Sequence, residues 1–127
     1  MQLLTPTQIS PLQPPLRHSD RLIVMGSCFA EHIGRRLVEM KWRAQVNPFG
    51  VLYNPLSISE ALERMLACRP YTEDELVCFP DGGWNTWLHY SRYSHSDKGE
   101  ALAAINASFL QASALLRQAD MLIVTLG

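Results

Sequence analysis

The residues best suited to covalent chemistry stand together in the tripeptide Gly26-Ser27-Cys28, which offers a hydroxyl and a thiol as nucleophiles. An apolar run ends just before it and a helical pattern begins just after it, so we expect a tight turn between a strand and a helix. Such a turn exposes its side chains to the positive end of the helix dipole, which stabilises a thiolate or an oxyanion. In the structural alternative, Ser27 caps the helix and Cys28 is a small buried residue.

Two histidines and a tryptophan are candidates to complete a site around this turn. His32 lies four residues after Cys28, so the two side chains could share a helix face and form a dyad; alternatively, His32 is simply solvated. His89 and Trp87 belong to an aromatic segment that could line a pocket, or they are ordinary loop residues. No spacing typical of metal ligands and no glycine-rich phosphate-binding loop occurs, so we expect neither a metal nor a cofactor.

Composition argues against several classes of function. The chain has 127 residues, of which 47% are apolar and 18% charged, as is ordinary for one globular domain. Its net charge of −1 argues against a nucleic-acid partner. No apolar run approaches the roughly 20 residues that span a bilayer, and no signal peptide is visible, so we expect no membrane partner. Three cysteines, an odd and small number, favour reduced thiols and a cytoplasmic location.

The elements that position these residues alternate between strand and helix patterns. Apolar runs typical of strands occupy residues 21–25, 44–46 and 121–126, and patterns typical of amphipathic helices occupy residues 29–41, 58–69 and 98–118. Capping boxes are predicted at Ser57 with Glu60 and at Thr72 with Glu75, and glycines at residues 82–83 indicate a hairpin or a long excursion. The alternation predicts an α/β fold with a parallel sheet, preceded by a proline-rich arm over residues 1–20.

Three glycine-containing segments follow the predicted strands: Gly26-Ser27-Cys28, Asn47–Gly50 and Gly127. Ligands of parallel sheets bind beyond the carboxyl ends of the strands, and a glycine lets the backbone approach a ligand closely. If the three strands are neighbours, these segments converge on one site. We therefore expect Asn47 to lie near the turn and to line its pocket.

The residues Gly26 to Ala30 read G-S-C-F-A, and in these letters the chain resembles the GSCFA domain family. The likeness continues in order along the chain from Arg21 to Gly127. Asn47–Gly50 together with Tyr53–Ile58 resembles the family's second block. Trp84–Ser94 resembles its aromatic and histidine segment, and Leu122–Gly127 resembles its third strand.

That family is grouped with the SGNH, or GDSL-like, hydrolases. The resemblance therefore implies a flavodoxin-like three-layer α/β/α fold and hydrolysis of an acyl or acetyl ester, with a small molecule or a carbohydrate as the ester substrate. SGNH enzymes carry a Gly-Asp-Ser turn after the first strand, and its serine is the nucleophile. Position by position, the resemblance matches Gly26 to the glycine, Ser27 to the aspartate and Cys28 to the nucleophilic serine. Chemical similarity to serine instead favours Ser27 as the nucleophile. The resemblance also places Gly50 at the glycine whose N–H contributes to the oxyanion hole, and Gly127 at the start of the third block.

The sequence departs from the SGNH pattern in its last part. The SGNH base is a histidine in a late Asp-x-x-His segment, and an oxyanion asparagine follows the third-block glycine; neither occurs here. We therefore expect residues 21–127 to be the N-terminal part of one longer domain, truncated after the third core strand and inactive alone. An open sheet edge would then favour self-association. The alternative function is a non-catalytic domain of the same fold that binds a small molecule or a carbohydrate.

Overall fold

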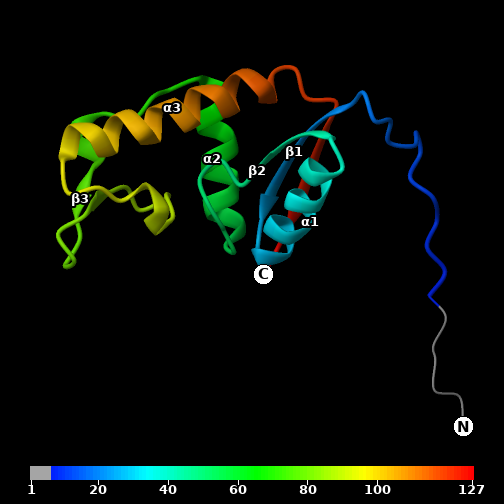
Figure 1. The fold of residues 1–127 in the computed structure, drawn as a ribbon, viewed down its shortest axis with the longest axis horizontal. Helices are drawn as coiled ribbons and strands as arrows, with labels where there is room; N and C mark the ends of the chain where they lie inside the picture. The colour runs from blue at the N-terminus through cyan, green and yellow to red at the C-terminus, as the bar shows by residue number, and fades with distance from the viewer. Residues whose placement is uncertain (1–6) are drawn as a thin grey trace, which may run out of the picture.

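The computed structural model of the chain describes residues 7–127. Three longer strands alternate with three helices, and a long excursion separates the second helix from the third (Figure 1). The main elements are β1 (Arg21–Gly26), α1 (Cys28–Glu39), β2 (Arg43–Val46), α2 (Pro55–Ala67), α3 (Lys98–Leu116) and β5 (Met121–Thr125).

The sheet places β1 between β2 and β5, and both neighbours run parallel to it. Its central position explains why the four residues from Leu22 to Met25 are almost completely buried. The predicted α/β class with a parallel sheet is confirmed. The order β2–β1–β5 is the order of the first three strands in a flavodoxin-like sheet.

Helices cover both faces of β1 (Figure 1). Ile23 and Met25 point to one face, because side chains alternate along a strand. There they pack against apolar side chains of α2 and α3, among them Ile58, Ala61, Met65, Ile105 and Phe109. On the other face α1 approaches β2 so closely that a Cβ at Gly34 would collide with Val46. The result is a layer of strands between two layers of helix.

The start of α2 differs from the prediction. Asn54 is the N-cap: its side chain accepts a hydrogen bond of 2.9 Å from the N–H of Leu56, and Pro55 is the first helical residue. The capping box predicted at Ser57 is therefore wrong, because asparagine followed by proline starts the helix three residues earlier. The second predicted box is confirmed, since Thr72 and Glu75 form both of its hydrogen bonds.

The excursion between α2 and α3 contains only short elements. A 3-10 turn (η1, Glu73–Glu75) precedes the hairpin strands β3 (Val77–Cys78) and β4 (Trp84–Asn85), and a second 3-10 turn (η2, Ser91–Tyr93) follows. The two strands pair antiparallel, which confirms the predicted hairpin. The excursion therefore depends on side-chain contacts, which fix it against α2 and α3.

The described part of the arm, residues 7–20, forms no helix or strand and runs away from the body (Figure 1). Its end is attached to the body by His18, whose Nε2 lies 2.9 Å from the carbonyl oxygen of Met40. The His18 ring also lies 4.9 Å from the Trp42 ring. Ile9, further out, is 84% exposed.

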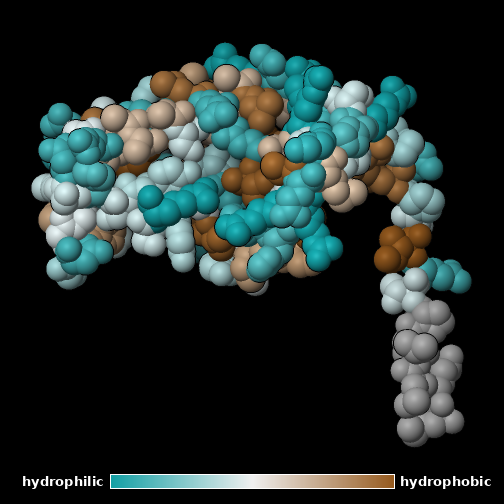
Figure 2. Space-filling view, viewed as in Figure 1, coloured by the Kyte–Doolittle hydropathy of each residue, from teal (hydrophilic) through white to brown (hydrophobic). Residues whose placement is uncertain are grey.

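Strand β5 is much less covered than β1. Leu122 and Val124 are 38% and 40% exposed, although they pair in register with the buried Ile23 and Met25. The helices that bury β1 leave this face of β5 partly open. Figure 2 shows hydrophobic side chains reaching the surface between hydrophilic ones elsewhere on the molecule as well.

Candidate active site

The turn Gly26-Ser27-Cys28 connects β1 directly to α1, as predicted. Gly26 has a φ of +131°, and a Cβ at this position would collide with the carbonyl oxygen of Thr125 on β5. Only glycine permits both this conformation and this close approach. The chain thus leaves β1 against β5 and enters α1 within two residues.

The two nucleophile candidates differ sharply in exposure. Ser27 is 5% exposed, and its Oγ lies 2.9 Å from the Oγ1 of Thr125. It is the N-cap residue, yet its side chain makes no capping hydrogen bond, because it faces β5. Cys28 is exposed, so the alternative that made it a buried residue is wrong. The accessible nucleophile of the turn is therefore the Cys28 thiol.

Asn47 holds the turn in place and does not face solvent, since it is only 1% exposed. Its Oδ1 accepts a hydrogen bond of 2.9 Å from the N–H of Gly26, and its Nδ2 donates one of 2.8 Å to Glu31 on α1. Its own N–H donates to the carbonyl of Val24 at 2.8 Å. Asn47 adopts a φ of 42°, a left-handed conformation that asparagine tolerates better than most residues. It joins the ends of β1, β2 and α1.

Gly50 lies at the same edge, with a φ of +89°, and a Cβ there would collide with Tyr90. Its N–H donates a hydrogen bond of 2.8 Å to the carbonyl of Asn47. The donor that the resemblance assigns to the oxyanion hole is therefore engaged inside the loop in this structure. Next to it, the N–H of Leu52 donates to the carbonyl of Gly26 at 2.9 Å, which fixes the loop against the turn.

Tyr53 is a residue at this edge that sequence reasoning missed. Its ring lies so close to Gly127 that a Cβ there would be 2.6 Å from the tyrosine Cδ1, and the residue is 56% exposed. The charge of the nearby Cys28 raises the pKa of the Tyr53 phenol, and partial desolvation adds to the shift. The structure thus brings all three glycine segments together, with Tyr53 packed against the last of them.

His32 does not join this group. The histidine is exposed on α1, and within residues 7–127 no hydrogen bond connects it to Cys28. The structure therefore shows the shared helix but not the dyad that the four-residue spacing allows.

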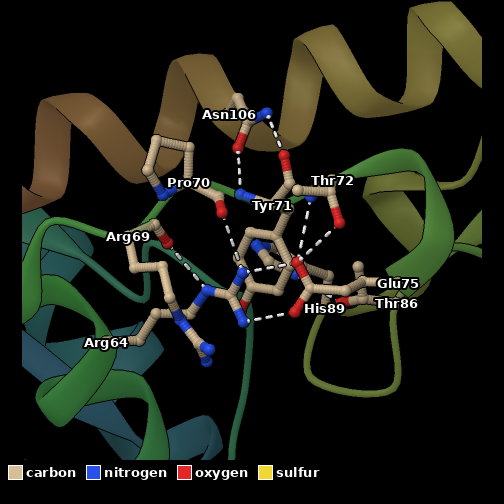
Figure 3. A network of polar contacts seen from close by, with 9 residues as sticks. All are labelled: Arg64, Arg69, Pro70, Tyr71, Thr72, Glu75, Thr86, His89 and Asn106. Carbon is tan, nitrogen blue, oxygen red and sulfur yellow. Dashed lines mark hydrogen bonds and ion pairs between the residues drawn. The ribbon is translucent and has the colours of Figure 1, made fainter.

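His89 lies in the core of the excursion (Figure 3). It is 7% exposed, its Nδ1 is 2.7 Å from the Oγ1 of Thr86, and its ring centroid is 4.8 Å from that of Phe49 and 4.9 Å from that of Tyr71. Burial, reinforced by the charges of two arginines, lowers its pKa to about 4. His89 is therefore a neutral core residue at pH 7. Trp87, in contrast, is 78% exposed at the rim of a cavity of about 340 Å³.

An ion pair between the buried Arg64 and the partly exposed Glu75 stabilises this region (Figure 3). Both terminal nitrogens of Arg64 donate to the Glu75 carboxylate at 2.7 Å. Its Nε donates to the carbonyl of Arg69 at 2.9 Å, and one terminal nitrogen also donates to the carbonyl of Pro70 at 3.0 Å. The hydrogen bonds that Glu75 accepts from Arg64, with further ones from Thr72, lower the pKa of its carboxyl to about 2. The guanidinium also lies 3.6 Å from the centre of the Tyr71 ring. The guanidinium and the carboxylate both bond to protein atoms, as is typical of a network that stabilises the fold.

Residues 21–127 match the family model of the GSCFA family. The chain belongs to the GSCFA family. No curated protein and no solved structure matches it. In this GSCFA chain the five letters of the family name occupy the β1–α1 turn and the first turn of α1, so the signature coincides with the exposed thiol.

Within residues 7–127, no three His, Cys, Asp or Glu side chains gather to hold a metal ion. No helix in that part of the GSCFA chain combines the length and apolar character needed to cross a bilayer.

Proposed function

We propose that this GSCFA domain is an SGNH-like hydrolase or acyl transferase that acts on an acyl or acetyl ester, including esters of carbohydrates, with Cys28 as its nucleophile. The observation that carries the proposal is the position of the thiol. Cys28 is exposed at the first position of α1, at the carboxyl edge of a parallel sheet, where such folds bind their ligands. Ser27, the other candidate, is buried against β5.

The start of α1 supplies electrostatic support for the reaction. The first hydrogen bond back to the turn is donated by the N–H of Glu31 to the carbonyl of Ser27, at 3.2 Å. The N–H groups of Cys28 and Phe29 precede it and have no partner inside the helix. We infer that these donors, together with the helix dipole, stabilise the oxyanion, since the Gly50 N–H is engaged within its loop.

A second candidate function is a non-catalytic domain that binds a small molecule or a carbohydrate ester. Two observations favour it: the Gly50 donor is occupied, and in the described part of the chain no histidine bonds Cys28. Under this proposal Cys28 lines a binding site but forms no acyl adduct.

Acylation of Cys28 distinguishes the two functions. On mixing with p-nitrophenyl acetate, the hydrolase proposal predicts a burst of one p-nitrophenolate per chain and an acetyl adduct on the peptide that contains Cys28. Cys28→Ala should abolish both, whereas Ser27→Ala and the control Cys68→Ala should keep them. A burst that survives in Cys28→Ala would contradict the nucleophile assignment, and no adduct in the wild-type protein would favour the binding domain.

We further propose a cytoplasmic location and self-association through β5. The three cysteines are free thiols, as expected in a reducing compartment. The open edge of β5 and its exposed Leu122 and Val124 offer a strand and an apolar face to a second copy. Sedimentation should show a concentration-dependent dimer that Val124→Lys disperses; a monomer at all concentrations would contradict this.

A further inference from the structure

Arg92, in the turn η2, reaches the loop that carries Asn47 at the carboxyl edge of the sheet. Its Nη2 donates a hydrogen bond of 2.6 Å to the carbonyl of Asn47, and its Nη1 lies 3.9 Å from a carboxylate oxygen of Glu31 on α1. Within residues 7–127, the other hydrogen bond to that carbonyl comes from the N–H of Gly50, inside the same loop. Arg92 therefore connects the Asn47 carbonyl to the rest of the fold.

The next carbonyl of the loop has two partners from outside it. The Tyr93 hydroxyl donates to the carbonyl of Pro48 at 2.7 Å, and the Ser108 Oγ on α3 donates to it at 2.9 Å. Loss of either hydroxyl leaves the other in place, whereas loss of the Arg92 guanidinium leaves the Asn47 carbonyl with no described partner outside its own loop. The contact from Arg92 thus has no substitute.

Asn47 connects this contact to the turn that carries the thiol. Its side chain accepts a hydrogen bond from the N–H of Gly26 and donates one to Glu31. Gly26 lies two residues before Cys28, and Glu31 lies three residues after it. The left-handed φ of 42° at Asn47 costs energy in a residue other than glycine, so contacts with the surroundings must maintain it. The hydrogen bond from Arg92 is one of these contacts.

We propose that Arg92 is a positioning residue of the Cys28 site: it holds Asn47 in place, and Asn47 holds the turn between β1 and α1. The inference rests on the proposed function for its meaning in catalysis, whereas the reactivity of the thiol tests the geometry alone. A hydrogen bond from a charged guanidinium is stronger than one between neutral groups, so a single side chain can maintain this loop.

Arg35 provides a matched control for Arg92. Its Nη2 lies 3.2 Å from the same Glu31 oxygen that Arg92 approaches, and in the described part of the chain it bonds no atom of the Asn47 loop. Arg92→Ala and Arg35→Ala each remove one positive charge beside Glu31, but only Arg92→Ala removes the hydrogen bond to the Asn47 carbonyl. The pair of variants therefore separates positioning from charge.

Alkylation of the three cysteines by iodoacetamide measures the effect without turnover. We expect Arg92→Ala to slow the alkylation of Cys28 at pH 7 by about three- to tenfold, because a looser turn no longer holds the thiol at the start of α1. Arg35→Ala should leave the rate within about twofold of wild type. The rates of Cys68 and Cys78 should stay within about twofold in both variants.

A guanidinium ion added from solution distinguishes positioning from general support of the fold. Arg92→Ala removes the side chain from beside the Asn47 carbonyl, so methylguanidinium chloride should raise the Cys28 alkylation rate of this variant toward the wild-type value. Equimolar sodium chloride should not. Guanidinium ions weaken folds in general, so a residue that only stabilises the fold would show no such recovery. Arg92→Lys keeps the charge and a donor and should lose less than Arg92→Ala.

Burst kinetics with p-nitrophenyl acetate connect the inference to the proposed reaction. Arg92→Ala keeps the nucleophile, so the burst should still release one p-nitrophenolate per chain. Its rate constant should fall by about three- to tenfold, as the alkylation rate does. Loss of the burst amplitude in Arg92→Ala would contradict a role in positioning alone.

The outcomes separate this inference from the proposed function. An unchanged Cys28 rate in Arg92→Ala, an equal loss in Arg35→Ala, or no recovery with methylguanidinium would overturn the role of Arg92, whether or not Cys28 is acylated. Faster alkylation of all three cysteines in Arg92→Ala would show a general loss of the fold and would overturn it as well. If the alkylation results are as expected but the wild-type protein forms no acetyl adduct, the proposed function fails and Arg92 still positions the thiol.

Discussion

Two regions of this molecule hold its chemically active side chains, and they use them in opposite ways. In the excursion, Arg64, Glu75 and His89 are buried or paired, and their charges are satisfied by neighbouring protein groups. At the carboxyl edge of the sheet, Cys28 and Tyr53 are exposed and face solvent. The difference shows which charged groups are used inside the fold. We propose that the excursion contributes stability and that the edge contributes reactivity, although the sequence offered histidines and aromatic residues for both.

The largest effect on stability should come from breaking the pair between Arg64 and Glu75. Arg64→Met keeps the apolar stem but removes the bonds to Glu75 and to two carbonyls, so we expect a loss of about 3 kcal/mol in the free energy of unfolding. The control is Arg35→Met, which breaks an exposed pair with Glu31 and should cost below about 1 kcal/mol. Urea unfolding measures both, and equal costs would contradict the comparison.

Acid should destabilise the protein through the same region. The pKa of His89 is lowered to about 4 in the folded state, so folding favours its neutral form. Its contribution is complete above the unfolded pKa of about 6.5 and is lost as pH falls through 4, which removes about 3 kcal/mol at the acid end. Glu75, with a pKa of about 2, acts in the same direction at still lower pH.

The variant His89→Gln isolates the histidine contribution. It should flatten the dependence of unfolding free energy on pH between 6.5 and 4, while the loss through Glu75 at lower pH remains. Chemical denaturation across that range makes the measurement. An unaltered slope in the variant would show that His89 is not the group that titrates.

Substitution of Asn47 should affect both the stability of the fold and the reactivity of Cys28, because Asn47 is buried at the edge where Cys28 lies. Asn47→Ala leaves the buried N–H of Gly26 without its partner and removes one hydrogen bond of Glu31, which keeps its pair with Arg35, so we expect a loss of about 2 kcal/mol. Unlike Arg64→Met, it should also change the alkylation rate of Cys28, since it loosens the turn. If Asn47→Ala is as stable as the wild type and its Cys28 is alkylated at the wild-type rate, Asn47 does not hold the turn in place.

The smallest effect on stability should come from the nucleophile itself. Cys28 is exposed, so Cys28→Ala should change the unfolding free energy by less than about 0.5 kcal/mol. Thermal unfolding measures the change. A large loss of unfolding free energy would show that Cys28 stabilises the fold, and would contradict the contrast between a stabilising excursion and a reactive edge.

Much of the fold could be predicted because its signals are local. Continuous apolar runs specified β1 and β5, helical spacing specified α1 and α3, and the Gly26 turn followed from their junction. The start of α2 was missed because two capping patterns compete within four residues, and Asn54 with Pro55 wins over Ser57.

The site was less predictable because loop residues follow no repeat that orients them. The positions of Asn47 and Gly50 at the sheet edge followed from the strand ends, but the burial of Asn47 depends on contacts with Gly26 and Glu31, distant in sequence. Tyr53 gave only one signal, its place shortly after the second strand. The burial of His89 likewise depends on rings contributed by other segments.

The central claim is that the edge makes Cys28 reactive, and the chain contains its own controls. Cys28, Cys68 and Cys78 are all exposed thiols, but Cys28 begins α1, whereas Cys68 follows the last residue of α2, at the negative end of that helix dipole. Limited alkylation of the folded wild-type protein, followed by peptide mass spectrometry, compares the three rates in one sample. The account predicts that Cys28 reacts at least about tenfold faster than Cys68 and Cys78. Equal rates, or a faster Cys68, would contradict it.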